Sequence, residues 1–230
     1  MTIALCLITW NEIDGVRHDI PLIDRSKFEQ IYCIDGGSTD GTLEYLKEQG
    51  ITVYNQKRRG LNAACIEGVD HCNCDAFVFF HPKGTIPVED LYKYRSLFEK
   101  GYEFVVGSRM IKGAHNEEDE NFFRPRKVMV KGLAGLSILF FKREGNSIID
   151  VLHGFRGMTV EAFKKLEIPD LTSMSIDIEM VCRSYRKHIK RIEFPTYETR
   201  RISGKSHFNV FNAGTRVVIY VFWERLFNKT

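Results

Sequence analysis

The sequence predicts an α/β fold, with a mostly parallel sheet and helices on both faces. Short apolar runs alternate with amphipathic segments through the first half of the chain, at the spacing of strand–helix–strand units. Hydrophobic residues make up 43% and charged residues 27% of the 230 residues, as in soluble globular chains. These observations exclude a disordered, collagenous or coiled-coil protein.

The first half of the chain contains five apolar runs that predict strands. The helix after the second run begins at Thr42 and ends before Gly50, which are typical start and stop residues. Parallel sheets bind ligands at the carboxyl ends of their strands, so the loops there are the candidate site. Strands are predicted at 3–9, 30–35, 51–54, 76–80 and 104–107, and helices at 42–49, 62–69 and 88–100.

The second half has longer helical segments and fewer strands. An acidic segment without apolar periodicity predicts a loop, and a basic segment near the end predicts irregular backbone. We expect the two halves, 1–112 and 113–230, to be fused in one domain. The predictions are a loop at 113–120, helices at 125–142, 160–166 and 176–185, strands at about 150–158 and 190–195, an irregular segment at 197–208 and an amphipathic tail at 213–227.

Charge and motif content exclude several classes of function. The 33 basic and 30 acidic residues leave a net charge of +3, too little to predict nucleic-acid binding. Neither a GxGxxG segment nor a P-loop is present, which disfavours a dinucleotide dehydrogenase and a P-loop kinase. The six cysteines form no CxxC pair, so a zinc site is disfavoured and reduced thiols in a cytoplasmic protein are expected.

The sequence predicts no signal peptide and no membrane span. Its first residues lack a basic segment, and its longest charge-free apolar runs, 132–141 and 217–223, fall short of the roughly 20 residues that cross a bilayer. Basic and aromatic residues flank both runs. That pattern fits a buried core helix and a helix lying on a membrane surface, so peripheral membrane contact stays open.

Two polar segments follow the first and second predicted strands. Residues 34–42 read IDGGSTDGT, where a carboxylate precedes two glycines in a tight turn. Asp35 would contact a nucleotide base or ribose there, while an ordinary capped turn gives the same pattern. Thr9, Asn11 and Glu12 end the first strand, where a helix cap is the alternative.

An ordered set of motifs resembles the family 2 inverting glycosyltransferases, in the pattern of the dolichol- and polyprenol-phosphate sugar synthases. No single motif is specific, but the set keeps its order over about residues 3–207. The motifs are Thr9-Trp10-Asn11-Glu12, Asp35 to Thr42 with Gly36 in place of a second Asp, Arg59-Gly60, Gly107-Ser108-Arg109, Arg126, Asp150 with Gly154-Phe155-Arg156, Glu179 and the basic loop 201–206.

The resemblance implies a GT-A type fold that binds a UDP- or GDP-linked sugar in its first half. It implies an acceptor, polyprenyl phosphate or a related cell-envelope molecule, in the second half. Arginine suits a phosphate acceptor because its planar fork matches phosphate geometry. The implied donor-binding residues are Thr9, Asn11, Glu12, Asp35, Gly37, Asp40 and Arg59, and the implied acceptor-binding residues are Arg109, Arg126, Arg156, Arg201 and Lys205. His81 and Lys83 are added to the donor-binding residues because they follow the fourth predicted strand.

The chain departs from the family at the Asp-x-Asp motif, which holds a divalent ion such as Mg²⁺ or Mn²⁺. His81-Pro82-Lys83-Gly84 stands in its place. Mg²⁺ prefers carboxylate oxygen, whereas Lys83 carries a positive charge that pairs directly with a diphosphate. Three interpretations stay open: Lys83 replaces the metal, a metal is bound through Asp35 or His81, or the protein binds a ligand without catalysis.

The acceptor determines whether a general base is needed. A hydroxyl acceptor requires one, and Asp150, Asp177 and Glu179 are the candidates. A phosphate acceptor is already ionised and requires none; Arg109 and Arg126 favour it. A catalytically silent binding protein is the main alternative function. A sugar nucleotidyltransferase is disfavoured because residues 9–16 lack a Gly-rich basic loop.

Overall fold

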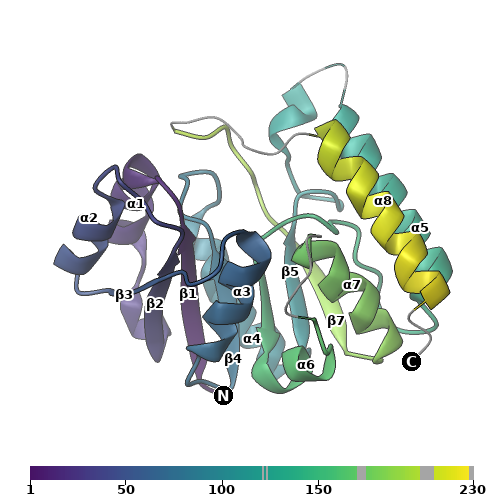
Figure 1. Cartoon of the computed structure of the whole chain (residues 1–230), viewed down its shortest axis with the longest axis horizontal. Helices are drawn as coiled ribbons and strands as arrows, with labels where there is room; N and C mark the ends of the chain where they lie inside the picture. Colours follow the sequence, from purple (N-terminus) through teal and green to yellow (C-terminus); the bar gives the residue numbers. More distant parts are fainter. Residues whose placement is uncertain (121, 123, 170–174, 203–209, 228–230) are drawn as a thin grey trace.

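The computed structural model describes residues 1–120, 122, 124–169, 175–202 and 210–227. Its centre is a seven-stranded sheet with the order β3-β2-β1-β4-β6-β5-β7 (Figure 1). β6 pairs antiparallel with both of its neighbours, and the other pairings are parallel. The strands are β1 (Ile3–Thr9), β2 (Gln30–Asp35), β3 (Thr52–Asn55), β4 (Ala76–Phe80), β5 (Phe104–Ser108), β6 (Arg156–Thr159) and β7 (Arg191–Pro195).

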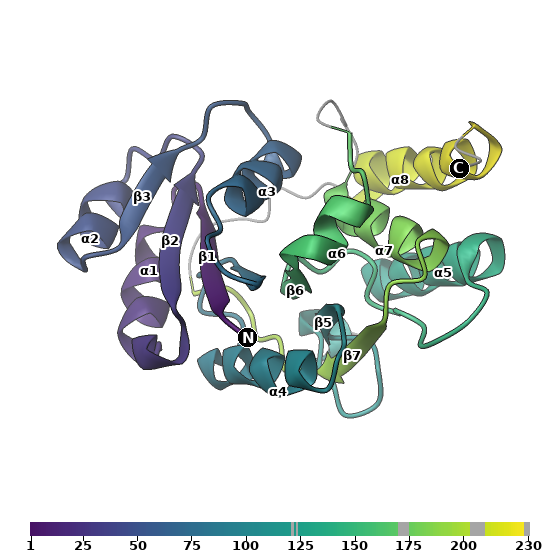
Figure 2. The ribbon, with the colours of Figure 1, turned by 90° about the horizontal axis from the view of Figure 1, so that it is seen from below.

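Helices cover both faces of this sheet, as predicted. Figure 2 shows α3 and α4 on opposite sides of the strands. The α-helices are α1 (Ile13–Asp19), α2 (Thr42–Glu48), α3 (Leu61–Asp70), α4 (Lys93–Glu99), α5 (Pro125–Phe141), α6 (Val160–Lys165), α7 (Ile176–Arg186) and α8 (Val210–Phe227). The 3₁₀ turns are η1 (Ile20–Leu22), η2 (Arg25–Lys27), η3 (Val88–Tyr92) and η4 (Glu117–Glu120).

The alternation of side chains along the strands builds a core on each face of the sheet. In β1, Leu5 and Leu7 belong to the core under α1, α2 and α4, whereas Ala4 and Cys6 belong to the core under α3, α5, α6, α7 and α8. Because successive side chains of a strand point to opposite faces, a fully apolar strand serves both cores. All six cysteines are free thiols, as predicted.

Several elements differ from the sequence-based prediction. The helix predicted at 88–100 begins as the 3₁₀ turn η3 and continues as α4, and the loop predicted at 113–120 contains η4. The segment after Glu12 forms helix α1, which was not predicted. The strand predicted at about 150–158 is limited to β6. Before β6, the amides of Ile149 and Asp150 both donate to the side-chain carboxylate of Glu193, at 2.8 Å, and do not pair with the backbone of a neighbouring strand. Residues 149–155 therefore form a loop.

Among the described residues, no helix is long and apolar enough to cross a membrane.

Candidate functional site

The loops after β1 and β2 are joined at the carboxyl edge of the sheet, the upper edge in Figure 1. Thr9 Oγ1 donates to Asp35 Oδ1 at 2.7 Å, and the amides of Gly37 and Ser38 donate to Asp35 Oδ2 at 2.8 and 2.7 Å. The carboxylate of Asp35 is fully buried. Both of its oxygens therefore hold the turn, and its contact with a nucleotide stays a prediction.

A second set of bonds joins the same two loops. Asn11 Oδ1 accepts from the amide of Thr39 at 2.8 Å. Asp40 accepts from the amides of Ile13 and Thr42 at 3.0 and 3.1 Å, so it connects the start of α1 to the start of α2. The polar residues of both motifs thus form one hydrogen-bonded network.

The loop that replaces the Asp-x-Asp motif is held against α1. A Cβ atom at Gly15 would lie 2.1 Å from the carbonyl oxygen of Pro82, so only glycine allows this approach. The amide of Gly84 donates to Asp19 Oδ2 at 2.9 Å. These contacts fix the backbone on both sides of Lys83.

The two titratable residues of this loop have different surroundings. His81 packs against Gly154, and burial, followed by the nearby charge of Lys83, lowers the pKa of its imidazole well below the ordinary value. His81 is therefore neutral. Burial also lowers the pKa of Lys83, which is partly exposed. Within the described ranges, the Lys83 amine forms no hydrogen bond or ion pair.

Lys83 lies among charged groups from both halves of the chain. Glu12 and Glu198 stabilise its charged form, while Arg201 and Arg109 oppose it. Arg201 Nη2 donates to both carboxylate oxygens of Glu12, at 2.5 and 2.7 Å, so the basic segment after β7 reaches back to the loop after β1. The charges of this pair and of the network around Arg109 therefore both act on Lys83.

Arg109 is the centre of an ion-pair network at the end of β5. Its Nε and Nη2 donate to the two oxygens of Asp150 at 2.8 and 3.0 Å, and its Nη1 donates to Glu198 at 3.1 Å. Burial alone would raise the pKa of Asp150, but Arg109 lowers it to about 2. Asp150 is therefore an ionised partner of Arg109, poorly suited to accept a proton near neutral pH.

His153 completes the loop between Asp150 and β6. Its Nδ1 lies 2.6 Å from the carbonyl oxygen of Gly107. Burial, followed by the charge of Arg109, lowers the pKa of His153 to about 3. The imidazole is neutral near pH 7, so Nδ1–H donates to that carbonyl and ties this loop to β5.

Three residues predicted for the acceptor side or as bases are buried beneath the site. Arg156 is 1% exposed; its guanidinium donates to the carbonyl of His153 and lies 3.2 Å from Asp177 Oδ1. Glu179 is fully buried and pairs with Arg183 at 3.1 Å. In this conformation Arg156 and Glu179 hold α7 in place, and their contacts with substrate stay a prediction.

The remaining predicted residues are spread over neighbouring loops. Arg59 is exposed between β3 and α3. Arg126, at the start of α5, pairs with Glu117 at 2.5 Å. Lys205 lies outside the described residues.

Sequence reasoning missed Glu198 and His153. No motif contains Glu198, but it follows β7, which runs parallel to β5 and therefore ends at the same edge of the sheet. That rule would have placed Glu198 near Arg109 once the pairing was known. His153 lies inside the Asp150–Arg156 motif, at a position that the motif leaves unspecified.

The residues after β4 do not fit a divalent metal. Neutral His81 offers one nitrogen, and Lys83 adds a positive charge where the family motif has carboxylates. Asp35 has both oxygens engaged in the turn. Across the described parts of the chain, no group of three His, Cys, Asp or Glu side chains has an arrangement that would hold a metal ion. We therefore derive no step through a metal.

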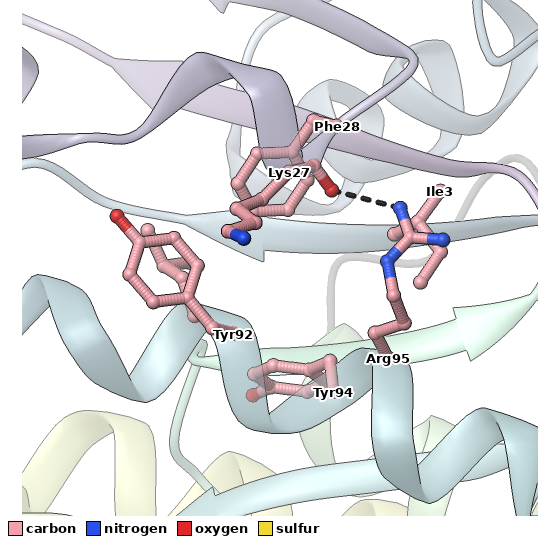
Figure 3. Close-up of a pocket in the computed structure, with 7 residues that line it drawn as sticks. Ile3, Lys27, Phe28, Tyr92, Tyr94 and Arg95 are labelled. Atoms are coloured by element: carbon pink, nitrogen blue, oxygen red, sulfur yellow. Dashed lines mark hydrogen bonds between the residues drawn. The ribbon is translucent and has the colours of Figure 1, made fainter.

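A small cavity lies at the opposite edge of the sheet. Figure 3 shows its lining, in which Arg95 donates to the carbonyl of Lys27 at 2.8 Å beside Phe28 and Tyr92. Its volume is about 40 Å³ and its wall is mostly apolar, so it is too small to hold a nucleotide sugar and is better described as a packing defect. The charged cluster at the carboxyl edge remains the candidate site.

Known proteins share both the sequence pattern and the fold. The chain is 28% identical to glycosyltransferase AglJ of Haloferax volcanii, over 84% of this chain and 62% of that protein. It is 27% identical to dolichyl-phosphate hexose transferase of the same organism, over 94% and 90% of the two chains. It thus spans less than two thirds of the length of AglJ.

The fold is similar to that of glucosyl-3-phosphoglycerate synthase from Mycobacterium tuberculosis. A crystal structure of that enzyme with Mn²⁺, UDP-glucose and phosphoglyceric acid superposes with a TM-score of 0.67 and 17% identity, covering 97% of this chain and 79% of that one. This similarity establishes the fold, the GT-A type expected from the motifs. Residues 6–167 match the family described as glycosyl transferase family 2. Because this match covers most of the chain, the protein belongs to glycosyl transferase family 2.

Proposed function

We propose that the protein transfers a sugar from a UDP- or GDP-linked donor to polyprenyl phosphate or a related cell-envelope acceptor, with inversion at the anomeric carbon. One observation carries the proposal: the Lys83 amine is unpaired among the described residues, and charged groups of both the Glu12–Arg201 pair and the Arg109 network act on its charge. A cation in that position suits the diphosphate of a donor. The similarity to a dolichyl-phosphate hexose transferase supports the lipid-phosphate acceptor.

The donor would lie across the carboxyl ends of β1, β2 and β4. The rigid loops 9–12 and 35–42 would hold the nucleoside, and Arg59 and Lys83 would face the diphosphate. Arg201 would turn from Glu12 toward the same diphosphate, because a doubly charged phosphate group competes well with a single carboxylate.

The transfer needs few groups from the protein. An oxygen of the acceptor phosphate forms a bond to the anomeric carbon, while the bond from that carbon to the diphosphate breaks and its electron pair leaves with the nucleoside diphosphate. Lys83 stabilises the charge that develops on the leaving group. The acceptor phosphate is already ionised, so no general base is required. Arg109 and Arg126 would hold it, on the cytoplasmic face of a membrane.

Nucleotide binding measured with and without EDTA tests the donor side. UDP or GDP at about 100 times its dissociation constant should add about 2.7 kcal/mol to the free energy of unfolding, which raises the Tm by about 5–10 °C. We expect this shift to persist in EDTA. Lys83→Gln should weaken binding about 10- to 100-fold, the value of one charge-assisted hydrogen bond. Lys47→Gln, on the exposed side of α2, is the matched control.

Transfer to the acceptor is tested with a radiolabelled donor and polyprenyl phosphate. Labelled lipid that forms in EDTA supports the proposal. Nucleotide binding without turnover on any acceptor would instead favour the catalytically silent binding protein, and binding that requires Mn²⁺ or Mg²⁺ would remove the role given to Lys83.

A further inference from the structure

All three guanidinium nitrogens of Arg109 donate to carboxylates in this conformation. Asp150 accepts from Nε and Nη2, and both oxygens of Glu198 accept from Nη1, at 3.1 and 3.2 Å. One positive charge thus faces two carboxylates. A phosphate that approached Arg109 would meet net negative charge unless one of the two carboxylates moved away.

Asp150 is the fixed partner of the two. It is fully buried, it accepts from the backbone amide of Arg109 at 2.9 Å, and its own amide donates to Glu193 at 2.8 Å. Burial would raise the pKa of Asp150, but Arg109 lowers it to about 2, so the ionised carboxylate is strongly stabilised in place.

Glu198 is the partner that can leave. Burial raises the pKa of its carboxyl and Arg109 offsets this only in part, so the ionised form is less well stabilised than that of Asp150. The chain after β7 rises along the loop after β5 (Figure 1), where the amide of Glu198 donates to the carbonyl of His115 at 3.0 Å. Besides Arg109, the side chain accepts from Asn116 Nδ2 alone among the described residues, at 3.0 Å. The carboxylate can therefore rotate away while the backbone stays in place.

The second arginine of the proposed acceptor site is paired in the same way. Arg126 and Glu117 are 2.5 Å apart, and each side chain is 29% exposed. The charge of Glu117 also acts on Glu198, so the two pairs are close to each other. An anion with one negative charge would replace a carboxylate by an equal charge and gain little. A phosphate monoester carries almost two negative charges above pH 7 and gains more from the same arginines.

We propose that Glu198 is a specificity-determining residue for the acceptor: its carboxylate occupies Arg109 until a phosphate monoester displaces it, and acceptors with a single negative charge are rejected. The inference rests on the proposed function, in which Arg109 binds the acceptor phosphate. It adds a residue outside the sequence motifs and a reason for selecting a monoester over a diester.

Binding of two soluble analogues, measured by isothermal titration calorimetry at pH 8, tests the proposal. Geranyl phosphate has two negative charges at this pH, and its methyl ester has one. We expect the wild-type protein to bind geranyl phosphate at least about tenfold more tightly than the methyl ester. Glu198→Gln should tighten the binding of both about tenfold, because a charged competitor for Arg109 becomes a neutral one.

Glu120→Gln is the matched control. It removes the same charge from an exposed residue of η4 that pairs with Arg200 at 3.0 Å, and it should change both affinities less than about twofold. Glu117→Gln is a second variant, which frees Arg126 and should also tighten geranyl phosphate. The Tm of each variant establishes that it is folded.

The proposal is overturned if Glu198→Gln binds geranyl phosphate no more tightly than the wild type, or if the wild type binds both analogues equally. Equal tightening by Glu120→Gln also overturns it, because net charge would then explain the effect. These results leave sugar transfer to polyprenyl phosphate standing. Absence of geranyl phosphate binding in the wild type and in every variant would instead remove the phosphate acceptor, and with it both the proposed function and the role of Glu198.

Discussion

Ion pairs at this site fix the orientation of single side chains as well as balancing their charges. The two-pronged contact of Arg109 with Asp150 fixes the guanidinium plane, and the amide of Arg109 donates to the same carboxylate at 2.9 Å. Lys83 has the opposite situation, a fixed backbone and an amine without a bonded partner in the described structure. Arg109 is therefore already oriented before a ligand binds, whereas the amine of Lys83 is available to pair with a ligand.

Asp150→Asn tests the value of the buried pair. Removing one partner of a buried ion pair costs about 3–5 kcal/mol, so we expect a loss of that order in the free energy of unfolding at pH 7. The pKa of Asp150 is about 2 in the fold, below its ordinary 3.8, so its stabilisation is present above about pH 4 and is lost as the pH falls toward 2.

Urea denaturation of both proteins between pH 7 and pH 3 checks this. The stability difference should shrink as the pH falls, and exposed Glu48→Gln should leave the profile unchanged. A difference that stays constant over this range would mean that Asp150 is not ionised through Arg109.

At the scale of elements, the site depends on how closely α1 approaches the loop after β4. Glycine at position 15 lets the helix backbone touch the carbonyl of Pro82, and Asp19 at the end of the same helix binds the amide of Gly84. Two contacts from one short helix thus set the position of Lys83. α5 shows the contrasting case: a Cβ at Gly132 would meet nothing within 4 Å.

Alanine at these two glycines should therefore have opposite effects. Gly15→Ala pushes α1 away from the loop, and we expect a loss of about 1–3 kcal/mol in the free energy of unfolding together with weaker nucleotide binding. Gly132→Ala should stabilise α5 by about 0.5–1 kcal/mol and leave binding unchanged. Thermal denaturation and nucleotide titration measure both effects. Equal behaviour of the two variants would show that α1 does not position this loop.

At the scale of the whole molecule, the two halves of the chain share one sheet. β5 belongs to the first half, yet both of its neighbours, β6 and β7, come from the second half. β4 likewise pairs with β6. Residue 112 therefore marks no structural boundary, and the division into donor and acceptor halves stays a prediction about function.

We expect the protein to unfold in one cooperative step and fragment 1–112 to lack a cooperative transition, because β5 loses both partners. The two tryptophans report on different halves: Trp10 follows β1 and Trp223 lies in α8. Urea transitions of Trp10→Phe and Trp223→Phe, followed by fluorescence, should coincide. Separate midpoints, or a cooperatively folded fragment, would contradict the single unit.

The sequence by itself determined most of the elements and the edge of the sheet where the site lies. β1, β2 and β4 match their predicted bounds. A short, nearly continuous apolar run between polar loops is typical of a strand that is buried on both faces of a sheet. Helix α1 was missed, since a helix of seven residues with a buried glycine is too short to have a clear apolar period. The motifs of the loops after β1 and β2 identified one connected surface, because parallel strands bring their carboxyl ends together.

Only the tertiary structure decided which charged residues meet. Arg109, Arg126 and Arg156 look alike in the sequence, yet one joins a network with Asp150 and Glu198, one pairs at the start of α5, and one is buried under α7. It also decided that α8 turns Glu224 inward and its apolar residues outward. The physical reason is that burial and ion pairing depend on contacts between segments distant in the sequence. The extended backbone of a strand depends instead on the pattern of residues along the strand itself.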